Sequence, residues 1–409
     1  MRVISYALCV AWAVGMTGPS GAVADDAREG RFVQDRFCIS FWVDPPADQN
    51  MDAHYKKIAE AHFTVVVGGF GARTPEQVER QLALCEKYGL KAIVARSGLP
   101  ADKLPTGPAL WGYMVRDEPS AAEFPDLTEQ VAAIRRERPG KLAFINLFPN
   151  YASAGALGTE TYDEHVERFA REVDVDVLCM DHYPRMRPDA DGRQGYCDNL
   201  EVMRRVAQER GIPFWNFFNT MPFGPHFDPT EAQLRWQIYT SLAYGARGVL
   251  YFCYWTPVGG HEFPKGGAII TADGRPTRHY AQAQRINARL KNLGPTLMQL
   301  TSTGVYRIEP GQNAAEILVD TPIQNLTDGD YLVGVFTHED GRTAVLLNNY
   351  RFAYTAWPTV TFRVDPARIT EIDQDTGSEI PLRDDSPAMD GIQISLDSGE
   401  GRLFLVDVQ

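Results

Sequence analysis

The chain of 409 residues carries 53 acidic and 40 basic residues, which gives a formal net charge of -13. An acidic chain without a basic run is a poor candidate for binding nucleic acid or an anionic membrane, so we expect neither partner. This length allows one large core with a smaller module beside it, and it leaves the oligomeric state open.

The first 24 residues have the pattern of a secretory signal peptide. Arg2 supplies the positive start, residues 3–16 are apolar, and Ala22-Val23-Ala24 is a small-residue cleavage site. The apolar run is too short to anchor the chain in a membrane. We therefore predict a secreted or periplasmic protein whose mature chain begins near Asp25, with residues 25–36 as an N-terminal leader.

Five cysteines follow the predicted signal peptide, at scattered spacings. An odd number at such spacings is not a disulfide framework, and no C-x-x-C pair suggests structural zinc. Cys38, Cys179 and Cys253 lie in apolar runs and are predicted to be buried. A single bridge through Cys197 stays open.

Between residues 37 and 294, short apolar runs alternate with helical stretches. The predicted strands lie in residues 37–44, 63–70, 90–96, 111–118, 142–150, 175–184, 212–220 and 248–255. Thr74 with Pro75 predicts the start of one helix, and residues 230–244 predict an amphipathic one. Eight such units over about 250 residues predict an α/β fold, the (β/α)8 TIM barrel. An open doubly wound sheet usually has a glycine-rich turn after its first strand, where this chain has Asp44-Pro45-Pro46.

After residue 294 the pattern changes to short β-rich segments. Runs such as YLVGVF and TAVLLNN are separated by turns rich in Asp, Gly and Ser. This pattern predicts a small C-terminal antiparallel β-sandwich domain over residues 295–409.

Two adjacent carboxylates, Asp117 and Glu118, end the fourth predicted strand, and Pro119 follows them. Side by side they repel, so one of them should hold its proton more tightly than a free carboxyl group. A carboxylic acid kept protonated near neutral pH can act as a general acid. Alternatively, one of the two merely caps the helix that follows.

In a TIM barrel the site lies at the carboxyl ends of the strands. This chain places carboxylates, amides and aromatic rings at nearly every such end, although each alone could be a core or loop residue. Carboxylates for proton transfer, amides for hydroxyl groups and rings for sugar faces together favour a glycoside site with a carbohydrate substrate. The candidates are Trp42, Asp44, Arg96, Asp117, Glu118, Asn146, Phe148, Asp181, His182, Tyr183, Asn216, Asn219, Tyr254 and Trp255.

Signals for several other chemistries are missing from the sequence. Strands seven and eight carry no phosphate-binding glycine loop, and no serine lies in a G-x-S-x-G turn. No H-x-H or H-E-x-x-H pattern suggests a catalytic metal. We therefore expect no cofactor and no metal.

Over residues 37–293 the chain resembles the (β/α)8 barrels of the glycoside hydrolases. In the beta-galactosidase-like clan the acid/base glutamate follows strand four after a polar residue, as Glu118 follows Asp117. The run from Asp181 to Pro184 is similar to the strand-six region that orients the nucleophile, and Trp255 fits the tryptophan that ends strand eight. The resemblance implies that Glu118 is the general acid and that the C-terminal domain is an accessory sandwich.

One departure from that clan concerns strand seven, which should end in a nucleophilic glutamate. Here it ends Asn216-Phe217-Phe218-Asn219-Thr220, with no carboxylate. The Asp-Glu-Pro tripeptide is similar to glycoside hydrolase family 123, in which the acetamido group of the substrate is the nucleophile. That similarity implies that Asp117 orients the acetamide, with Tyr183 or Asn219 binding its oxygen.

Inversion is the other route, with Asp181 or Glu262 activating water. The carboxyl groups must then lie roughly 6.5–9.5 Å apart, against about 5–5.5 Å for a retaining pair. We predict a secreted glycoside hydrolase in which Trp42, Tyr254 and Trp255 form sugar platforms. The alternative is a non-catalytic carbohydrate-binding protein on a degenerate glycosidase barrel.

Overall fold

The computed structural model describes residues 30–259, 263, 267–384 and 386–408. The predicted signal peptide, residues 25–29 of the leader, and Glu262 lie outside this part of the chain. No helix in the described residues is long and apolar enough to cross a bilayer.

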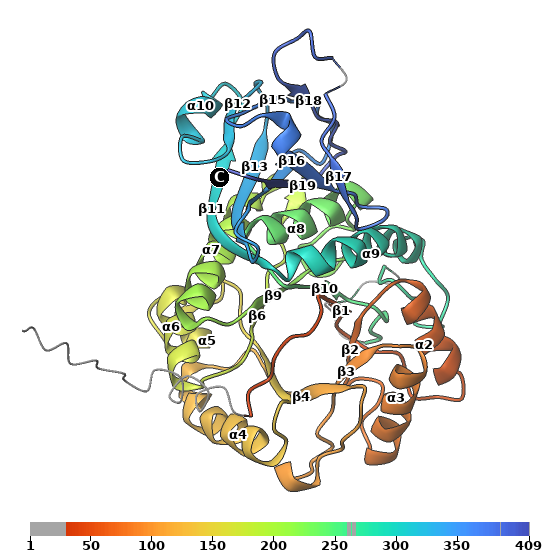
Figure 1. Cartoon of the computed structure of the whole chain (residues 1–409). Helices are drawn as coiled ribbons and strands as arrows, with labels where there is room; N and C mark the ends of the chain where they lie inside the picture. The colour runs from red at the N-terminus through yellow and green to blue at the C-terminus, as the bar shows by residue number, and fades with distance from the viewer. Residues whose placement is uncertain (1–29, 260–262, 264–266, 385, 409) are drawn as a thin grey trace, which may run out of the picture.

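Eight parallel strands form the first part of the fold, in two four-stranded sheets of order β1-β10-β9-β6 and β2-β3-β4-β5. Figure 1 shows them around a common centre, with helices outside. The strands are β1 (Cys38–Phe41), β2 (Val65–Val67), β3 (Lys91–Val94), β4 (Leu110–Asp117), β5 (Leu142–Asn146), β6 (Leu178–Asp181), β9 (Phe214–Asn219) and β10 (Gly248–Phe252).

The two sheets meet at both edges. At one edge the Thr64 amide donates to the Ile39 carbonyl at 2.9 Å. At the other edge the Leu147 amide donates to the Cys179 carbonyl at 2.8 Å, and the Asp181 amide donates to the Leu147 carbonyl at 3.3 Å. Parallel strands joined in this way are compatible with the predicted barrel.

Helices connect most of these strands. They are α2 (Met51–Glu60), α3 (Pro75–Lys87), α4 (Phe124–Glu137), α5 (Ala154–Leu157), α6 (Tyr162–Glu172), α7 (Arg193–Arg210), α8 (Glu231–Ala243) and α9 (Arg278–Leu297). The predicted start of α3 is confirmed: the Thr74 hydroxyl accepts the Gln77 amide, and Pro75 is the first helical residue.

Between β3 and β4 the described chain forms only the 3₁₀ turn η1 (Ala101–Lys103). After β4 comes a second, η2 (Ala121–Glu123), and β7 (Met186–Arg187) pairs with β8 (Ala190–Asp191) in the loop after β6.

Large side chains fill the space inside the eight strands. Trp111 and Trp215 stack with ring centroids 6.1 Å apart, and Phe144 packs on Trp215 at 5.9 Å. Cys38 and Cys179 belong to the same buried cluster, as predicted from their apolar runs. All five described cysteines are free, so the structure contains no bridge through Cys197.

Two antiparallel sheets form the C-terminal part, at the top of Figure 1. One has six strands in the order β11-β13-β14-β19-β16-β17 and the other has three in the order β12-β15-β18. The apolar side chains of Val333, Val345 and Val360 lie in one buried cluster that joins the two sheets. The bounds are β11 (Leu300–Ile308), α10 (Ala314–Ile317), β12 (Ile323–Leu326), β13 (Tyr331–His338), β14 (Thr343–Asn349), β15 (Thr359–Phe362), η3 (Pro366–Arg368), β16 (Ile369–Ile372), β17 (Glu379–Pro381), β18 (Ile392–Gln393) and β19 (Gly401–Val406).

Helix α8 lies between the two parts of the fold and differs from the amphipathic helix that the sequence predicts. Nine of its residues, including Trp236, Ile238 and Leu242, are buried, because the C-terminal sheet covers the face that would otherwise meet solvent. Gly334 of β13 permits this contact, since a Cβ there would lie 2.5 Å from the Ala243 carbonyl oxygen.

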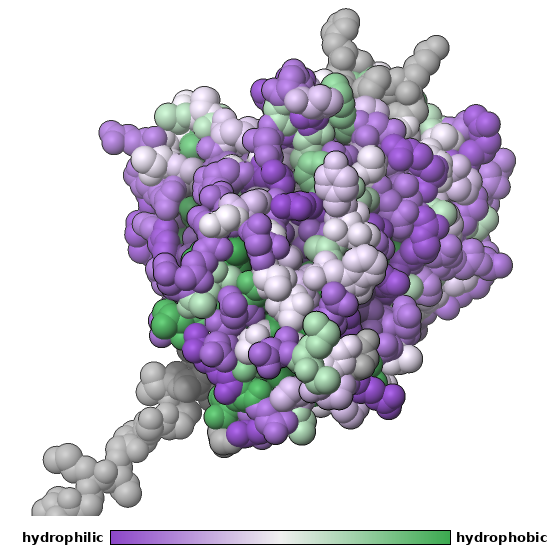
Figure 2. Space-filling view, turned by 90° about the horizontal axis from the view of Figure 1, so that it is seen from above, coloured by the Kyte–Doolittle hydropathy of each residue, from purple (hydrophilic) through white to green (hydrophobic). Residues whose placement is uncertain are grey.

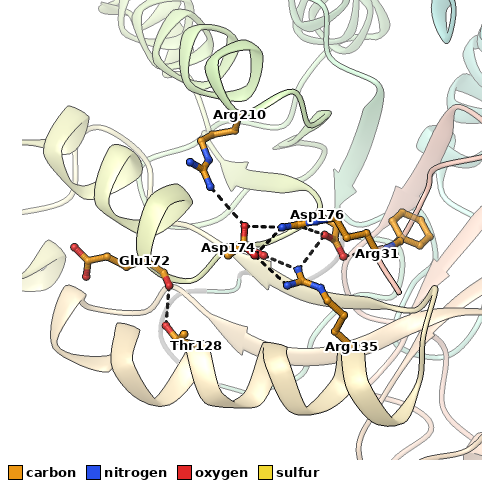
Figure 3. Close-up of polar contacts among 8 residues, drawn as sticks. Arg31, Thr128, Arg135, Glu172, Asp174, Asp176 and Arg210 are labelled. Atoms are coloured by element: carbon orange, nitrogen blue, oxygen red, sulfur yellow. Dashed lines mark hydrogen bonds and ion pairs between the residues drawn. The ribbon is translucent and has the colours of Figure 1, made fainter. Parts of the chain in front are cut away.

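The segment before β1, which we call the N-terminal strap (residues 31–37), is tied to the amino-terminal side of β6. Arg31 forms ion pairs with Asp174 and Asp176 at 2.7 and 2.8 Å. Arg135 of α4 forms ion pairs with the same two carboxylates at 3.0 and 3.1 Å. Figure 3 shows these carboxylates between the arginines, with Arg210 reaching Asp174 from α7. Asp176 also accepts the Phe32 amide at 3.0 Å, so one buried carboxylate fixes the strap.

Replacing Asp176 with alanine should reduce the stability of the fold. Arg31 and Arg135 would lose one of their two carboxylates, and the buried Phe32 amide would lose its acceptor. We expect the free energy of unfolding in urea to fall by about 2 kcal/mol. The control Asp35→Ala removes only the exposed pair with Arg36, so its change should stay within about 0.5 kcal/mol. Equal losses in both variants would contradict this role.

Candidate active site

Three carboxylates meet at the carboxyl ends of β4 and β6, around one amide from β5. Parallel pairing aligns Asp117 with Asn146. The Asn146 Nδ2 atom donates to Asp117 Oδ1 at 3.2 Å and to Asp181 Oδ1 at 2.9 Å. One amide nitrogen therefore holds the two carboxylate oxygens close to each other. The array brings together three of the predicted residues, and Glu118 follows directly.

Glu118 has an unusual backbone. Its φ is +46°, in the left-handed region that side-chain-bearing residues seldom occupy, and its amide donates to the Asn146 carbonyl at 2.8 Å. Strain of this kind persists where the surrounding structure imposes it, and it clusters at functional sites. The following helical turn does not use either carboxylate as its cap, because the Glu123 carboxylate accepts the Ser120 amide there at 2.9 Å.

The surroundings favour protonated carboxyl groups. Burial raises the pKa of Asp181 well above its ordinary value, and the charges of Glu118 and Asp117 raise it further. Asp117 is open to solvent along the mouth of the strands, yet the protein around it removes part of its hydration and raises its pKa, against the hydrogen bond from Asn146. Asp181 is only 6% exposed, so of the two it is the better placed to hold a proton.

Two aromatic residues, Trp42 and Tyr183, follow the carboxyl ends of β1 and β6. Tyr183 packs on Phe252 at 4.9 Å and on Phe223 at 5.2 Å, all within the cluster inside the strands. Burial raises the pKa of the Tyr183 phenol, and the nearby charge of Asp181 adds to this effect. Trp42 lies on the same inner side, with its ring edge-on to Phe217 at 5.3 Å. Tyr183 and Trp42 therefore lie on the inner side of the strands, and their contact with a sugar stays a prediction.

Sequence reasoning missed Tyr151, which precedes α5. Tyr151 is 56% exposed, yet the protein around its phenol removes part of its hydration and raises its pKa, as does the nearby charge of Asp181. His182 supports it, with the two rings edge-on at 5.0 Å. The His182 Nδ1 atom donates to Asn199 Oδ1 at 2.9 Å, and burial lowers the pKa of His182 to about 4. His182 is therefore a neutral supporting ring behind Tyr151.

Four other predicted residues bond to loop or helix groups and not to the carboxylate array. The Asp44 carboxylate accepts the amides of Phe70 and Gly71 at 2.9 and 2.8 Å, and burial raises its pKa to about 6. Arg96 donates to Gln130 of α4. Asn219 accepts the Met221 amide and donates to the Phe227 carbonyl. Asn216 donates to Tyr196 on the helical side of its strand.

Tyr254 and Trp255 differ from the prediction that they form sugar platforms at the mouth. Tyr254 is 1% exposed and stacks on Phe41 at 4.4 Å, in the layer between strands and helices. Trp255 packs against His54 of α2 at 5.0 Å. Strand β10 ends at Phe252, and this residue, which sequence reasoning missed, is the one whose ring faces inward. Because side chains alternate along a strand, the inward-facing Leu250 predicts that Phe252 faces inward as well.

A cavity of about 960 Å³ lies at the opposite ends of the strands, beside the N-terminal strap. Of the three carboxylates that line it, Asp176 is paired with two arginines and Asp35 with Arg36. In the described residues no group of three or more His, Cys, Asp or Glu side chains has a geometry suited to a metal ion. The carboxylates that Asn146 brings together lie at the other ends of the strands, away from this cavity.

No protein-family model matches the chain. No curated protein matches it in sequence. Among solved structures it is similar to a family 42 β-galactosidase from G. stearothermophilus, with TM-score 0.61 and 10% identity over 92% of this chain and 100% of that one. A β-galactosidase from Bacillus circulans sp. alkalophilus gives TM-score 0.59 and 10% identity over 91% and 99% of the two chains.

This chain spans less than two thirds of the length of two longer β-galactosidases. For the one from the haloarchaeon Halorubrum lacusprofundi, the match covers 63% of this chain and 58% of that chain, with 14% identity and TM-score 0.50. At such identities the likeness concerns the fold. In fold, the chain resembles the TIM-barrel glycoside hydrolases.

Replacing Asp181 with asparagine should stabilise the protein, increasingly so as the pH rises. A carboxyl group whose pKa is raised by folding stabilises the native state below its unfolded pKa, and this contribution is lost as the pH rises toward the folded pKa. The difference in unfolding free energy between variant and wild type should therefore grow from about pH 4 upward, by up to about 1.4 kcal/mol per pH unit.

Urea denaturation at pH 4, 5, 6 and 7 measures this difference. The exposed Asp320→Asn substitution, on the C-terminal part, is the control and should give a constant difference. A difference for Asp181→Asn that is also constant with pH would show that Asp181 ionises freely in the folded protein.

Proposed function

We propose that the protein is a secreted glycoside hydrolase, a (β/α)8 barrel with a C-terminal β-sandwich domain, whose site is the carboxylate array around Asn146. The observation that carries this proposal is the sharing of one amide by Asp117 and Asp181 beside the strained Glu118. Aromatic rings beside carboxylates suit a sugar substrate. The fold that the chain shares with β-galactosidases supports the same class. Secretion follows from the predicted signal peptide.

Glu118 is the general acid in this proposal, and it protonates the glycosidic oxygen as the bond to C1 breaks. No carboxylate of β9 is available as nucleophile, because Asn219 stands at the end of that strand and is engaged with loop backbone. Asp181 is a poor base for inversion, since it is buried and its raised pKa favours the protonated form. These features favour assistance by the substrate over inversion.

In the substrate-assisted route the acetamido oxygen of the sugar attacks C1, and a cyclic intermediate forms. Asp117 accepts the acetamide N–H and balances the positive charge that develops on the ring. Water then attacks C1, with the carboxylate of Glu118 taking its proton, and the acetamido sugar is released. Asn146 holds Asp117 in place, while a protonated Asp181 leaves the pocket with fewer repelling charges.

Glu118→Gln should remove the acid and preserve the shape of the side chain. We expect kcat on glycosides with poor leaving groups to fall by about 10²–10⁴-fold, with little change in binding. The control Glu129→Gln lies exposed on α4 and should keep wild-type rates. Sugar binding without turnover in the wild type would instead identify the protein as a non-catalytic carbohydrate-binding protein.

The substrate-assisted route predicts a sharp preference for acetamido sugars. Aryl N-acetylhexosaminides should be hydrolysed, while the matching hexosides should be turned over at least about 10³-fold more slowly, because they lack the internal nucleophile. Asp117→Asn should reduce kcat on the acetamido substrate by about 10²-fold or more. Equal rates on both sugar types, with inverted configuration by NMR, would favour a base such as Asp181 or Glu262 instead.

A further inference from the structure

Two exposed aromatic residues lie in one loop of the C-terminal part. Trp357 is 65% exposed and Tyr354 is 69% exposed, both in the loop between β14 and β15. Among the tryptophans that the structure describes, Trp357 alone is exposed. Figure 2, seen from the side of the C-terminal part, shows that hydrophilic residues cover most of this face. A large ring in such a surface loses the burial that normally stabilises it, which suggests that a ligand covers it.

The loop that carries these rings is held firmly. Asn349, itself 1% exposed, donates to the Tyr354 carbonyl at 2.7 Å and to the Asp397 carbonyl at 3.1 Å. Ala356 and Leu396 exchange backbone hydrogen bonds of 2.9 and 2.8 Å. Tyr354 and Ala356 are thus fixed just before Trp357, so the rings are presented in a set position. A surface fixed in advance loses little conformational entropy when a ligand binds.

A pocket of about 210 Å³ adjoins Trp357 and is lined also by Asp328, Asp330, Asn349 and Arg351. The Asp330 carboxylate pairs with Arg307 and lies 3.7 Å from Arg351, whose side chain is 42% exposed. The charges of this pocket are therefore largely balanced internally, which disfavours a free ion as its ligand. What remains are hydrogen-bonding groups beside an aromatic face, a combination that matches the hydroxyl and C–H groups of a sugar ring.

We propose that Trp357, Tyr354 and this pocket form a carbohydrate-binding surface, separate from the carboxylate array, that holds a polysaccharide chain. The residues that line it come from positions 328–357, whereas the array comes from β4, β5 and β6. The choice of carbohydrate as ligand rests on the proposed function. Holding a polymer at a second site raises the effective concentration of its chain at the barrel mouth.

Affinity electrophoresis of the full-length mature protein tests this surface. The probes are native gels containing, in turn, galactan, arabinan, xylan or partially N-acetylated chitosan. We expect retardation of the wild type in at least one gel, and Trp357→Ala should weaken the apparent affinity by about tenfold or more. Trp357→Phe should retain part of it. The matched control Val319→Ala removes another exposed apolar side chain of the same part of the chain and should migrate as the wild type does.

Absence of retardation in all four gels, or equal retardation of Trp357→Ala and wild type, would overturn this surface. Turnover of aryl glycosides by the wild type, measured in parallel, separates this result from the fate of the proposed function. Retardation that depends on Trp357 without any turnover leaves the surface standing and removes the hydrolase. Turnover without such retardation overturns the surface and leaves the hydrolase standing.

Discussion

The site depends on the two hydrogen bonds that Asn146 donates from one nitrogen to carboxylates on different strands. Carboxylates repel at close range, and three of them gathered in a partly dry space would push their strands apart if all were ionised. An amide between two of them supplies positive partial charge without adding a titratable group. The register of β4 on β5, which aligns Asp117 with Asn146, brings the amide to that position.

Support for this array comes from outside it. His182 turns one nitrogen toward Asn199 of α7, and the Asn199 side chain in turn donates to Tyr162 of α6 at 2.8 Å. The neutral imidazole can then pack against Tyr151 without adding a charge beside the carboxylates. Two outer helices thereby position a ring at the carboxyl ends of the strands, so changes far from the carboxylates can alter the shape of the space beside them.

The sequence predicts the strands well and the direction of side chains near their ends less well. Each apolar run contains a strand, because a strand covered on both faces must be apolar throughout. Because these runs are apolar throughout, the sequence does not show which of their side chains face the inside of the strands. Tyr254 and Trp255 lie two and three residues beyond the end of β10, so the alternation that makes Phe252 face inward no longer governs them.

Asp117, Glu118, Asn146 and Asp181 could be placed together, since parallel strands bring their carboxyl ends to one side. Tyr151 could not, because it stands in a loop with no periodic pattern. No local sequence pattern predicts that Asp44 and Arg96 bond to neighbouring loop and helix groups. The exposure of Trp357 could not be predicted either, since an isolated aromatic residue in a turn-rich stretch is equally consistent with a buried core position.

The N-terminal strap bears on the order in which the chain can fold. Arg31 and its partner Asp176 are 145 residues apart, so the five strands β1 to β5 must be synthesised before this ion pair can form. Contacts between such distant residues form slowly, although the entropy cost of closing a longer loop grows only gently. The ion pairs that fix the strap are therefore long-range contacts, and they depend on a segment that is synthesised well after the strap itself.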